Sequence, residues 1–574
     1  MSIILGVNAV FHDPAAALLV DGEIVAAAEE ERFSRRKHGK EPVPFSAWEL
    51  PVDAMRWCLA HAGLEAADVD EVAYSYDPDL VPHPSRAGRV LRSPRPTSGD
   101  PTAPHGLHSR PTEIGDVTAD EWEPLRTLYV RRVPHFLATA LPGLRTDRLR
   151  YVAHHVAHAA SACVAAPDES SAVLVLDGRG EAASHLGGRW RDGTLEVLAG
   201  QRLPHSLGLL YEEVTAHLGF RRSSDEYKVM ALASYGDPDR FGPVFRDHVR
   251  ATDDGGFRVD PIDLGALVSP RGGDTTWADV HADLAAAVQQ RLEEVVLDLA
   301  RWLHGRTGER AIALAGGVAL NCVANGRLAA DGPYEHVWVQ PAAGDSGTAL
   351  GAALALAARR GERCAPFTTA ALGRGWDDDH LEAVLKAAEQ PYDRPVDLAE
   401  EVASALADGA VVGWFQGRSE YGPRALGHRS LLCDPRRPEN LGRMNAIKGR
   451  EEFRPVAPMV LAERAADIFD GVHPSPYMIF VHRVRPEWID RIPAVVHVDG
   501  TARIQSVDDR DEPLMAAVLR AFDRRTGVPV VVNTSFNTAG RPMVDTPQEA
   551  LECFGSGPVD LLALGPFTVR RARR

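Results

Sequence analysis

The sequence contains 574 residues, of which 45% are hydrophobic and 25% charged, and its formal net charge is -17. This length exceeds what one ordinary hydrophobic core accommodates, so we expect a globular protein with two major domains. The negative charge excludes a general binder of nucleic acid or of acidic membranes, and any phosphate site must therefore be a local cationic pocket.

The chain opens with a predicted strand at residues 3–8, followed by two apolar runs that flank Asp21 and Gly22, a typical hairpin turn. Two nearby side chains are candidates for chemistry. His12 is a candidate base for deprotonating a hydroxyl. Lys37 is a candidate for reaching toward a phosphate, although charge runs of this kind are usually solvated surface.

Residues 77–118 are rich in Pro, Arg, Ser and Gly and show no sustained periodicity. This composition predicts a long mobile loop. The loop is either a lid or an insertion without a function.

The stretch HHVAH places His154 and His158 four residues apart on a predicted helix, so that both imidazoles can reach one cation. A zinc-protease helix needs Glu after the first His, but here that position is His155, which we assign to packing. Asp177 and Asp345 end predicted strands and can supply oxygen ligands. Such a set suits Fe, Mn, Zn or Mg, whereas the alternative interpretation is that both acids are ordinary turn residues.

A second unit of strand, glycine turn and hairpin at residues 171–200 repeats the pattern of the N-terminal unit. The repetition predicts two related α/β halves with a cleft between them. Residues 279–303 have apolar residues at helical spacing and predict an amphipathic helix. Glycine-rich turns at residues 316–321 and 344–347 follow further strands, where backbone N–H groups can face an anion.

We place a domain boundary near residue 370, which leaves residues 1–370 in the first domain and residues 371–574 in the second. The second domain supplies many cations in a chain that is acidic overall. They are Arg418, Arg424, Arg429, Lys448, Arg454 and Arg503. With the polar stretch at residues 533–537, they suit a small molecule that bears both a phosphate and an amide. The alternative is that some of these arginines form structural ion pairs with nearby glutamates.

Six cysteines are scattered without the spacing of a metal site or of a disulfide framework, which is typical of reduced thiols in a cytoplasmic protein. The first residues lack a cationic segment before an apolar run, and no stretch approaches about 18 uninterrupted apolar residues. We therefore expect neither export nor membrane insertion.

The motifs together resemble one family over nearly the whole chain. They are FHDPAAALLVDGEIVAAAEEERFSRRKH, HHVAHAASA, LDGRGE, YKVMALASYG, AGGVALNCVANG, PAAGDSGTALGAA, GRSEYGPRALGHRSLL, REEFRPVAP and NTSFN. They resemble, in this order, the antibiotic and nodulation-factor O-carbamoyltransferases. The resemblance implies an α/β fold, with a duplicated ASKHA-type domain first and then an α/β domain similar to threonylcarbamoyl-adenylate synthase.

The resemblance implies that carbamoyl phosphate is cleaved in the second domain and that ATP activates the carbamate to carbamoyl-adenylate in the first. The implied metal ligands are His154, His158, Asp177 and Asp345, for divalent Fe, Mn or Mg. The implied nucleotide contacts are Asn8, Lys37, Gly178, Gly208, Gly316, Gly317 and Asn321. The implied carbamoyl phosphate site is Lys448, Arg454, Arg503, Asn533 and Ser535. The implied catalytic residues are His12, Lys448 and Arg454.

The implied acceptor is a hydroxylated natural product, with no nucleic acid or membrane as partner, and the protein is expected to be a monomer or homodimer. One departure lies around Lys228, because the family often has glycine before Lys228 and again after Met230, and it puts the local backbone contacts in doubt. Alternatives are a tRNA threonylcarbamoyltransferase-like enzyme, which the acidic charge disfavours, and an ASKHA-type small-molecule kinase, which leaves the arginines of the second domain unexplained.

Overall fold

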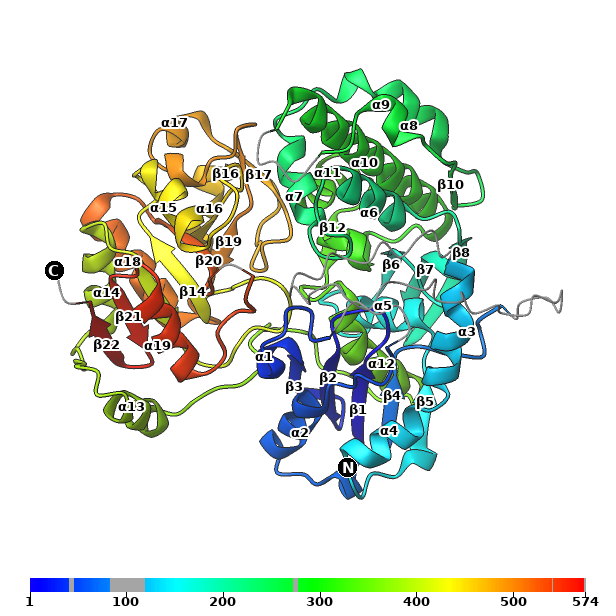
Figure 1. Ribbon diagram of the computed structural model, residues 1–574, viewed down its shortest axis with the longest axis horizontal. Coiled ribbons are helices and arrows are strands. Elements are labelled where there is room, and N and C mark those ends of the chain that lie inside the picture. The colour runs from blue at the N-terminus through cyan, green and yellow to red at the C-terminus, as the bar shows by residue number, and fades with distance from the viewer. Residues whose placement is uncertain (41–45, 83–118, 272–276, 539, 572–574) are drawn as a thin grey trace, which may run out of the picture.

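The computed structural model describes residues 1–40, 46–82, 119–271, 277–538 and 540–571. Three main sheets with packed helices form the chain, and the C-terminal sheet lies beside two N-terminal halves (Figure 1). From residue 83 onward, the loop predicted at residues 77–118 lies outside the described residues.

The first half is built on a five-stranded sheet in the order β3-β2-β1-β4-β5. Its strands are β1 (Ile3–Asn8), β2 (Ala15–Val20), β3 (Glu23–Glu29), β4 (Glu71–Tyr74) and β5 (Leu149–Tyr151). β1 runs antiparallel to β2 and parallel to β4. The predicted first strand is confirmed. Asp21 and Gly22, with φ of 50° and 81°, form the predicted hairpin turn.

The second half repeats this arrangement in the order β12-β11-β6-β7-β8. Its strands are β6 (Ser171–Leu176), β7 (Ala183–Arg191), β8 (Thr194–Arg202), β11 (Ala311–Ala315) and β12 (His336–Val339). β6 runs antiparallel to β7 and parallel to β11, as β1 does with β2 and β4. The predicted duplication of an α/β unit in the N-terminal part is therefore confirmed.

Two helices join the halves. α12 (Asp345–Arg359) packs on the first sheet, α5 (His154–Cys163) packs on the second, and the two helices pack against each other. The predicted amphipathic helix is α10 (Asp279–Thr307), which packs against the second half. The other elements of this region are α1 (Glu31–Ser34), α2 (Val52–His61), α3 (Ala119–Val130), α4 (Val133–Ala140), α6 (Leu207–His217), α7 (Glu226–Ala233), α8 (Gly242–His248), α9 (Leu264–Leu267), α11 (Cys322–Asp331), β9 (Val249–Ala251) and β10 (Phe257–Val259).

The C-terminal part forms a seven-stranded mixed sheet in the order β19-β15-β20-β14-β13-β21-β22. Its strands are β13 (Val412–Phe415), β14 (Arg429–Cys433), β15 (Ala457–Leu461), β19 (Gln505–Val507), β20 (Val530–Ser535), β21 (Leu561–Leu564) and β22 (Phe567–Arg570). A small sheet contains β16 (Phe469–Asp470), β17 (His482–Val484) and β18 (Thr501–Ala502). The helices are α13 (Asp378–Ala387), α14 (Leu398–Ala407), α15 (Glu439–Ile447), α16 (Ala462–Ile468), α17 (Pro486–Ile489), α18 (Pro513–Thr526) and α19 (Pro547–Ser556). The α/β fold class is confirmed, and the boundary near residue 370 stays a prediction.

All six cysteines are free thiols and five of them are buried, as the sequence predicts. Among the described helices, none combines the length and the apolar composition that a membrane crossing needs.

Two glycines bring α12 into direct backbone contact with its neighbours. A Cβ atom at Gly6 of β1 would lie 1.9 Å from the carbonyl oxygen of Ala349, and one at Gly351 would lie 1.8 Å from that of Ala157 on α5. Cβ atoms do not approach oxygen this closely, so only glycine fits at these two points.

We expect Gly351→Ala to lower the free energy of unfolding by about 1–3 kcal/mol, because its methyl group must push α5 and α12 apart. The midpoint of urea unfolding measures the change. Gly305→Ala in α10 is the matched control. A Cβ there meets no atom within 4 Å, and we expect about 0.5–1 kcal/mol of stabilisation. Equal effects of the two substitutions would contradict the packing argument.

Candidate functional site

Four side chains from three parts of the fold converge on one buried point. His154 and His158 lie in the first turns of α5, Asp177 follows β6, and Asp345 is the first residue of α12. Each offers one ligand atom, and these four atoms lie within 4.8 Å of one another. All four side chains are buried. The structure thus brings together the four residues predicted as metal ligands.

The donor set fits a divalent metal ion. Asp177 Oδ2 lies 3.3 Å from His154 Nε2 and 3.7 Å from His158 Nε2. Asp345 Oδ1 lies 3.6 Å from each of these two nitrogens. Neither ring nitrogen of the buried His158 has a hydrogen-bond partner among the described residues. A buried, unpaired imidazole that faces two carboxylates is the arrangement that Fe, Mn, Zn or Mg completes.

Surrounding groups fix the orientation of the predicted ligands. Nδ1 of His154 lies 3.2 Å from the carbonyl oxygen of Ser75, which leaves Nε2 facing Asp177. The backbone N–H of Gly317 donates to Asp177 Oδ1 at 3.0 Å. Burial works to lower the pKa of His154, but hydrogen bonds to Asp177 and Asp345 outweigh burial and hold this pKa well above its ordinary value.

His155, which the sequence assigned to packing, also lies close to the four predicted metal ligands. Its buried Nε2 is 3.7 Å from Asp177 Oδ2 and has no hydrogen-bond partner among the described residues. Burial lowers the pKa of His155, so its ring is neutral at neutral pH. The side chain therefore borders the candidate metal centre as well as packing beneath it.

The predicted nucleotide-contact glycines gather around Asp177. A Cβ at Gly208, in the first turn of α6, would lie 2.7 Å from the backbone nitrogen of Gly178. Gly316 has a φ of 92°, and a Cβ there would lie 2.2 Å from the carbonyl oxygen of Leu176. These glycines bring the start of α6, which favours negative charge, close to the end of β6.

The other predicted nucleotide contacts use their polar groups inside the protein. Asn8 is buried, and its amide donates to two backbone carbonyls of the following turn at 3.1 and 3.0 Å. Lys37 lies 3.0 Å from a carboxylate oxygen of Glu31. Asn321 caps α11 and donates to Gln289 at 2.8 Å. A role for these three residues in nucleotide binding stays a prediction.

A second constellation consists of cations in the C-terminal part. Lys448 follows α15, and its Nζ donates to the backbone and hydroxyl oxygens of Ser535, at 2.5 and 2.8 Å, and to Asn537. Burial lowers the pKa of Lys448 well below its ordinary value, and the charges of Arg450 and Arg454 lower it further.

Four arginines face one another beside this lysine: Arg424, Arg450, Arg454 and Arg503. Burial, together with repulsion from the other guanidinium groups, lowers the pKa of Arg424 and of Arg450 to about 9. The buried Nε atoms of Arg424 and Arg503 have no hydrogen-bond partner among the described residues. Mutually repelling cations with unused donors indicate a site for an anion. We name these four residues the arginine cluster.

A neutral acceptor lies beside the arginine cluster. Asn533 donates through Nδ2 to the carbonyl oxygen of Ala425 at 3.0 Å and to Gln505 Oε1 at 2.8 Å. Its buried Oδ1 has no partner within the described chain. An amide N–H of a bound molecule would satisfy this oxygen.

The arginine cluster borders the second N-terminal half. Arg424 donates to the carbonyl oxygen of Leu320 at 3.3 Å, one residue before Asn321. Glu451 lies 3.6 Å from Arg454 and 2.9 Å from Lys228 of α7, so Lys228 connects the two parts of the chain. The arginine cluster therefore lies at the interface between the C-terminal part and the second N-terminal half.

Comparison with known proteins identifies the family. The model described as "Carbamoyltransferase N-terminus" matches residues 3–354, and the one described as "Carbamoyltransferase C-terminus" matches residues 403–571. The chain belongs to the carbamoyltransferase family. The resemblance inferred from the motifs is thereby confirmed.

Several proteins are similar to this carbamoyltransferase. Nodulation protein NolNO of Sinorhizobium fredii is 37% identical over 98% of this chain and 80% of its own length. Nodulation protein NolO of Bradyrhizobium diazoefficiens is 40% identical over 73% of this chain and 78% of its own length. Among solved structures, HypF of T. kodakarensis is 14% identical, with a TM-score of 0.31, and the match covers 63% of this chain and 48% of that one.

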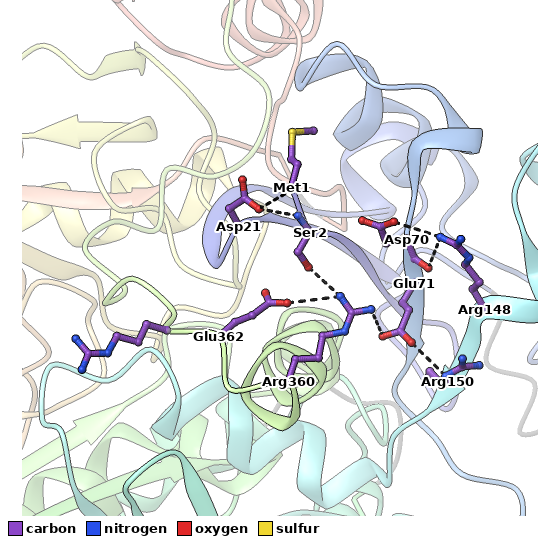
Figure 2. A pocket seen from close by; sticks show the side chains of 10 residues that line it. Met1, Ser2, Asp21, Asp70, Glu71, Arg148, Arg150, Arg360 and Glu362 are labelled. Atoms are coloured by element: carbon purple, nitrogen blue, oxygen red, sulfur yellow. Dashed lines mark hydrogen bonds and ion pairs between the residues drawn. The ribbon is translucent and has the colours of Figure 1, made fainter.

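The carbamoyltransferase also contains a charged cavity of about 710 Å³ at the N-terminal edge of the first sheet, which Figure 2 shows. Its opposite charges pair with one another: Arg360 lies 2.6 Å from Glu71, and Arg148 lies 3.2 Å from Asp70. The charges of these two arginines are therefore neutralised within the protein.

Two of the predicted cations of the carbamoyltransferase are structural. Arg429 donates to the carbonyl oxygens of Gln416 and Arg374, and Arg418 donates to that of Gly373. In contrast, the sequence interpretation omitted Arg450 from its cations, although Arg450 and Arg454 stand in the same motif, REEFRP. That shared motif was the signal that could have identified Arg450.

Proposed function

We propose that the protein is an ATP-dependent O-carbamoyltransferase that carries a carbamoyl group from carbamoyl phosphate to a hydroxyl of a small natural product. The observation that carries this proposal is the arginine cluster beside the unpaired Oδ1 of Asn533. Carbamoyl phosphate presents a phosphate at one end and an amide at the other, so both features match one small molecule. Family membership supports the same reaction class.

Cleavage of carbamoyl phosphate is assigned to the arginine cluster. Arg454 and Arg503 hold the phosphate oxygens and stabilise the charge that develops when phosphate leaves. Lys448 has a lowered pKa, which makes its ammonium group a better proton donor than an exposed lysine. Water supplies the missing oxygen, and the products are phosphate and carbamate.

Activation is assigned to the N-terminal site. His154, His158, Asp177 and Asp345 would hold a divalent metal, which when bound neutralises charge on nucleotide phosphates. The glycine turns around Asp177 offer backbone N–H groups to the same phosphates. A carbamate oxygen attacks the α-phosphate of ATP, which gives carbamoyl-adenylate and pyrophosphate.

Transfer completes the cycle. His12 lies 3.8 Å from Asp345, and we place it beside the carbamoyl group. The acceptor hydroxyl attacks the carbonyl carbon, His12 accepts its proton, and AMP departs. The contact between Arg424 and Leu320 supports a short internal path for carbamate, which decomposes when it is exposed to water.

We expect the protein to release AMP and pyrophosphate from ATP only when carbamoyl phosphate is present. Mass spectrometry of reactions with aminoglycosides, macrolides, ansamycins and sugars should then reveal one product that has gained a single carbamoyl group. Reactions without carbamoyl phosphate are the control. ADP in place of AMP would instead support a kinase, and carbamoyl transfer without ATP would overturn the proposed activation step.

A further inference from the structure

The carboxylate of Asp13 lies between two imidazoles and binds one with each oxygen. Oδ2 is 2.9 Å from His12 Nδ1, and Oδ1 is 2.9 Å from His38 Nδ1. The other side of the His38 ring is also held, because its Nε2 lies 2.8 Å from the hydroxyl of Ser224. Ser224 comes from the segment before α7, which is 186 residues away in sequence.

This chain of four side chains ends at the candidate metal centre. His12 Nε2 lies 3.8 Å from Oδ2 of Asp345. Because both histidines present Nδ1 to the carboxylate, His12 can turn Nε2 only toward the metal centre, and His38 can turn Nε2 only toward Ser224. Burial works to raise the pKa of Asp13, but His38 and His12 outweigh it and hold this pKa well below its ordinary value. Asp13 is therefore ionised and accepts from both rings.

Backbone strain gathers at the same place. Nine non-glycine residues of the described chain have a positive φ, and four of them belong to this chain of side chains or adjoin it. They are Phe11, Asp13, His38 and Ser223, with φ of 50°, 49°, 63° and 53°. Residues other than glycine disfavour a positive φ. The fold therefore maintains an unfavourable backbone conformation at several points that hold His12, Asp13, His38 and Ser224 in place.

We propose that His38, held by Ser224, is a positioning residue that fixes the Asp13 carboxylate and, through it, the His12 imidazole for carbamoyl transfer. The proposal rests on the proposed function, in which His12 lies beside the transferring group. His38 itself faces a hydroxyl of the protein and touches no proposed ligand of the metal. Its effect should therefore fall on the transfer step and spare the formation of carbamoyl-adenylate.

Two isosteric substitutions separate positioning from direct proton transfer. The amide nitrogen of Asn occupies the place of Nδ1, so His38→Asn keeps the donor to Asp13. The amide of Gln occupies the place of Nε2, so His38→Gln loses that donor. We expect His38→Gln to lower kcat for AMP release by roughly 10- to 100-fold, the usual cost of losing an outer-sphere partner, and His38→Asn to stay close to wild type.

The measurement uses the full chain with ATP and carbamoyl phosphate, with water and added glycerol as acceptors. The burst of pyrophosphate, which reports adenylate formation, and the KM for ATP should stay unchanged in both His38 variants. Ser224→Ala should lower the rate of AMP release less than His38→Gln does. Ser234→Ala is the matched control, because its hydroxyl donates to the carbonyl of Ala231 at the end of α7.

Equal losses in His38→Asn and His38→Gln would mean that the ring itself transfers a proton and would overturn the positioning role. Loss of the pyrophosphate burst in His38→Gln would overturn it as well. Wild-type protein that releases no pyrophosphate would instead contradict the proposed function. In that case, crystal structures of the two variants still test the positioning role without an activity assay. Only His38→Gln should show the His12 ring turned away from Asp345.

Discussion

Replacing His158 with alanine is expected to remove bound metal and carbamoyl-adenylate formation while the cleavage of carbamoyl phosphate continues. The ring nitrogens of His158 have no other partner in the described chain, so the substitution takes away a ligand and leaves Asp177 and Asp345 facing an incomplete site. The rate of pyrophosphate release should fall at least about 100-fold. Loss of a residue that only supports a metal ligand already lowers activity by up to about 100-fold, and His158 is a predicted ligand itself.

Elemental analysis of the purified protein measures the metal, and separate assays follow pyrophosphate and phosphate. His217→Ala is the control, because this half-buried imidazole on α6 binds the carbonyl of Val268 and lies outside the proposed metal ligands. Metal content should also rise with pH, since a metal must displace the proton that Asp177 and Asp345 hold on His154. Full metal content in His158→Ala would exclude this residue as a ligand.

Replacing Arg454 with alanine is expected to have the opposite effect. The rate of carbamoyl phosphate cleavage should fall roughly 10²- to 10³-fold, while ATP binding persists. Its guanidinium belongs to the arginine cluster, and preorganised donors of this kind contribute that much to the stabilisation of developing charge. Arg454→Lys should recover only part of the rate, because an ammonium group lacks the planar fork.

Stability provides the check on this second substitution. Removing one of four mutually repelling guanidinium groups should leave the melting temperature unchanged or raise it. Like charges that gather to bind an anion destabilise the protein when no anion is bound. Arg464→Ala is the control, since this surface arginine pairs with Asp467 in the same part of the chain. If Arg454→Ala and His158→Ala each abolished both half-reactions in folded protein, the assignment of two sites would be wrong.

Local sequence patterns predicted the N-terminal fold well because its signals are local. Asp21 and Gly22 have the positive φ that a tight hairpin requires, and the repeated unit at residues 171–200 produced the same sheet order a second time. The C-terminal sheet shows the opposite. β20 lies between β14 and β15, both far from it in sequence, and no local pattern indicates such a pairing.

The candidate site also contains residues that local sequence patterns identified and contacts that only the folded chain shows. His154 and His158 share one helix turn, and Asp177 and Asp345 stand at the ends of elements, so spacing and position identified all four. Spacing could not show that Asn8 uses its amide inside a turn. It also could not show the bond between His38 and Ser224, which only the folded chain brings together.

The seam between α5 and α12 determines how the two N-terminal halves can move. The carbonyl group of Ala157 packs directly against Gly351, where a side chain would leave no room for it. The carbonyl group of Ala349 packs against Gly6 in the same way. Interlocked backbones of this kind resist sliding, because any shift along the helix axes drives a carbonyl into a neighbouring residue. For the nucleotide binding that we propose, the two halves must therefore separate by a hinge rotation about this seam, turning as rigid bodies.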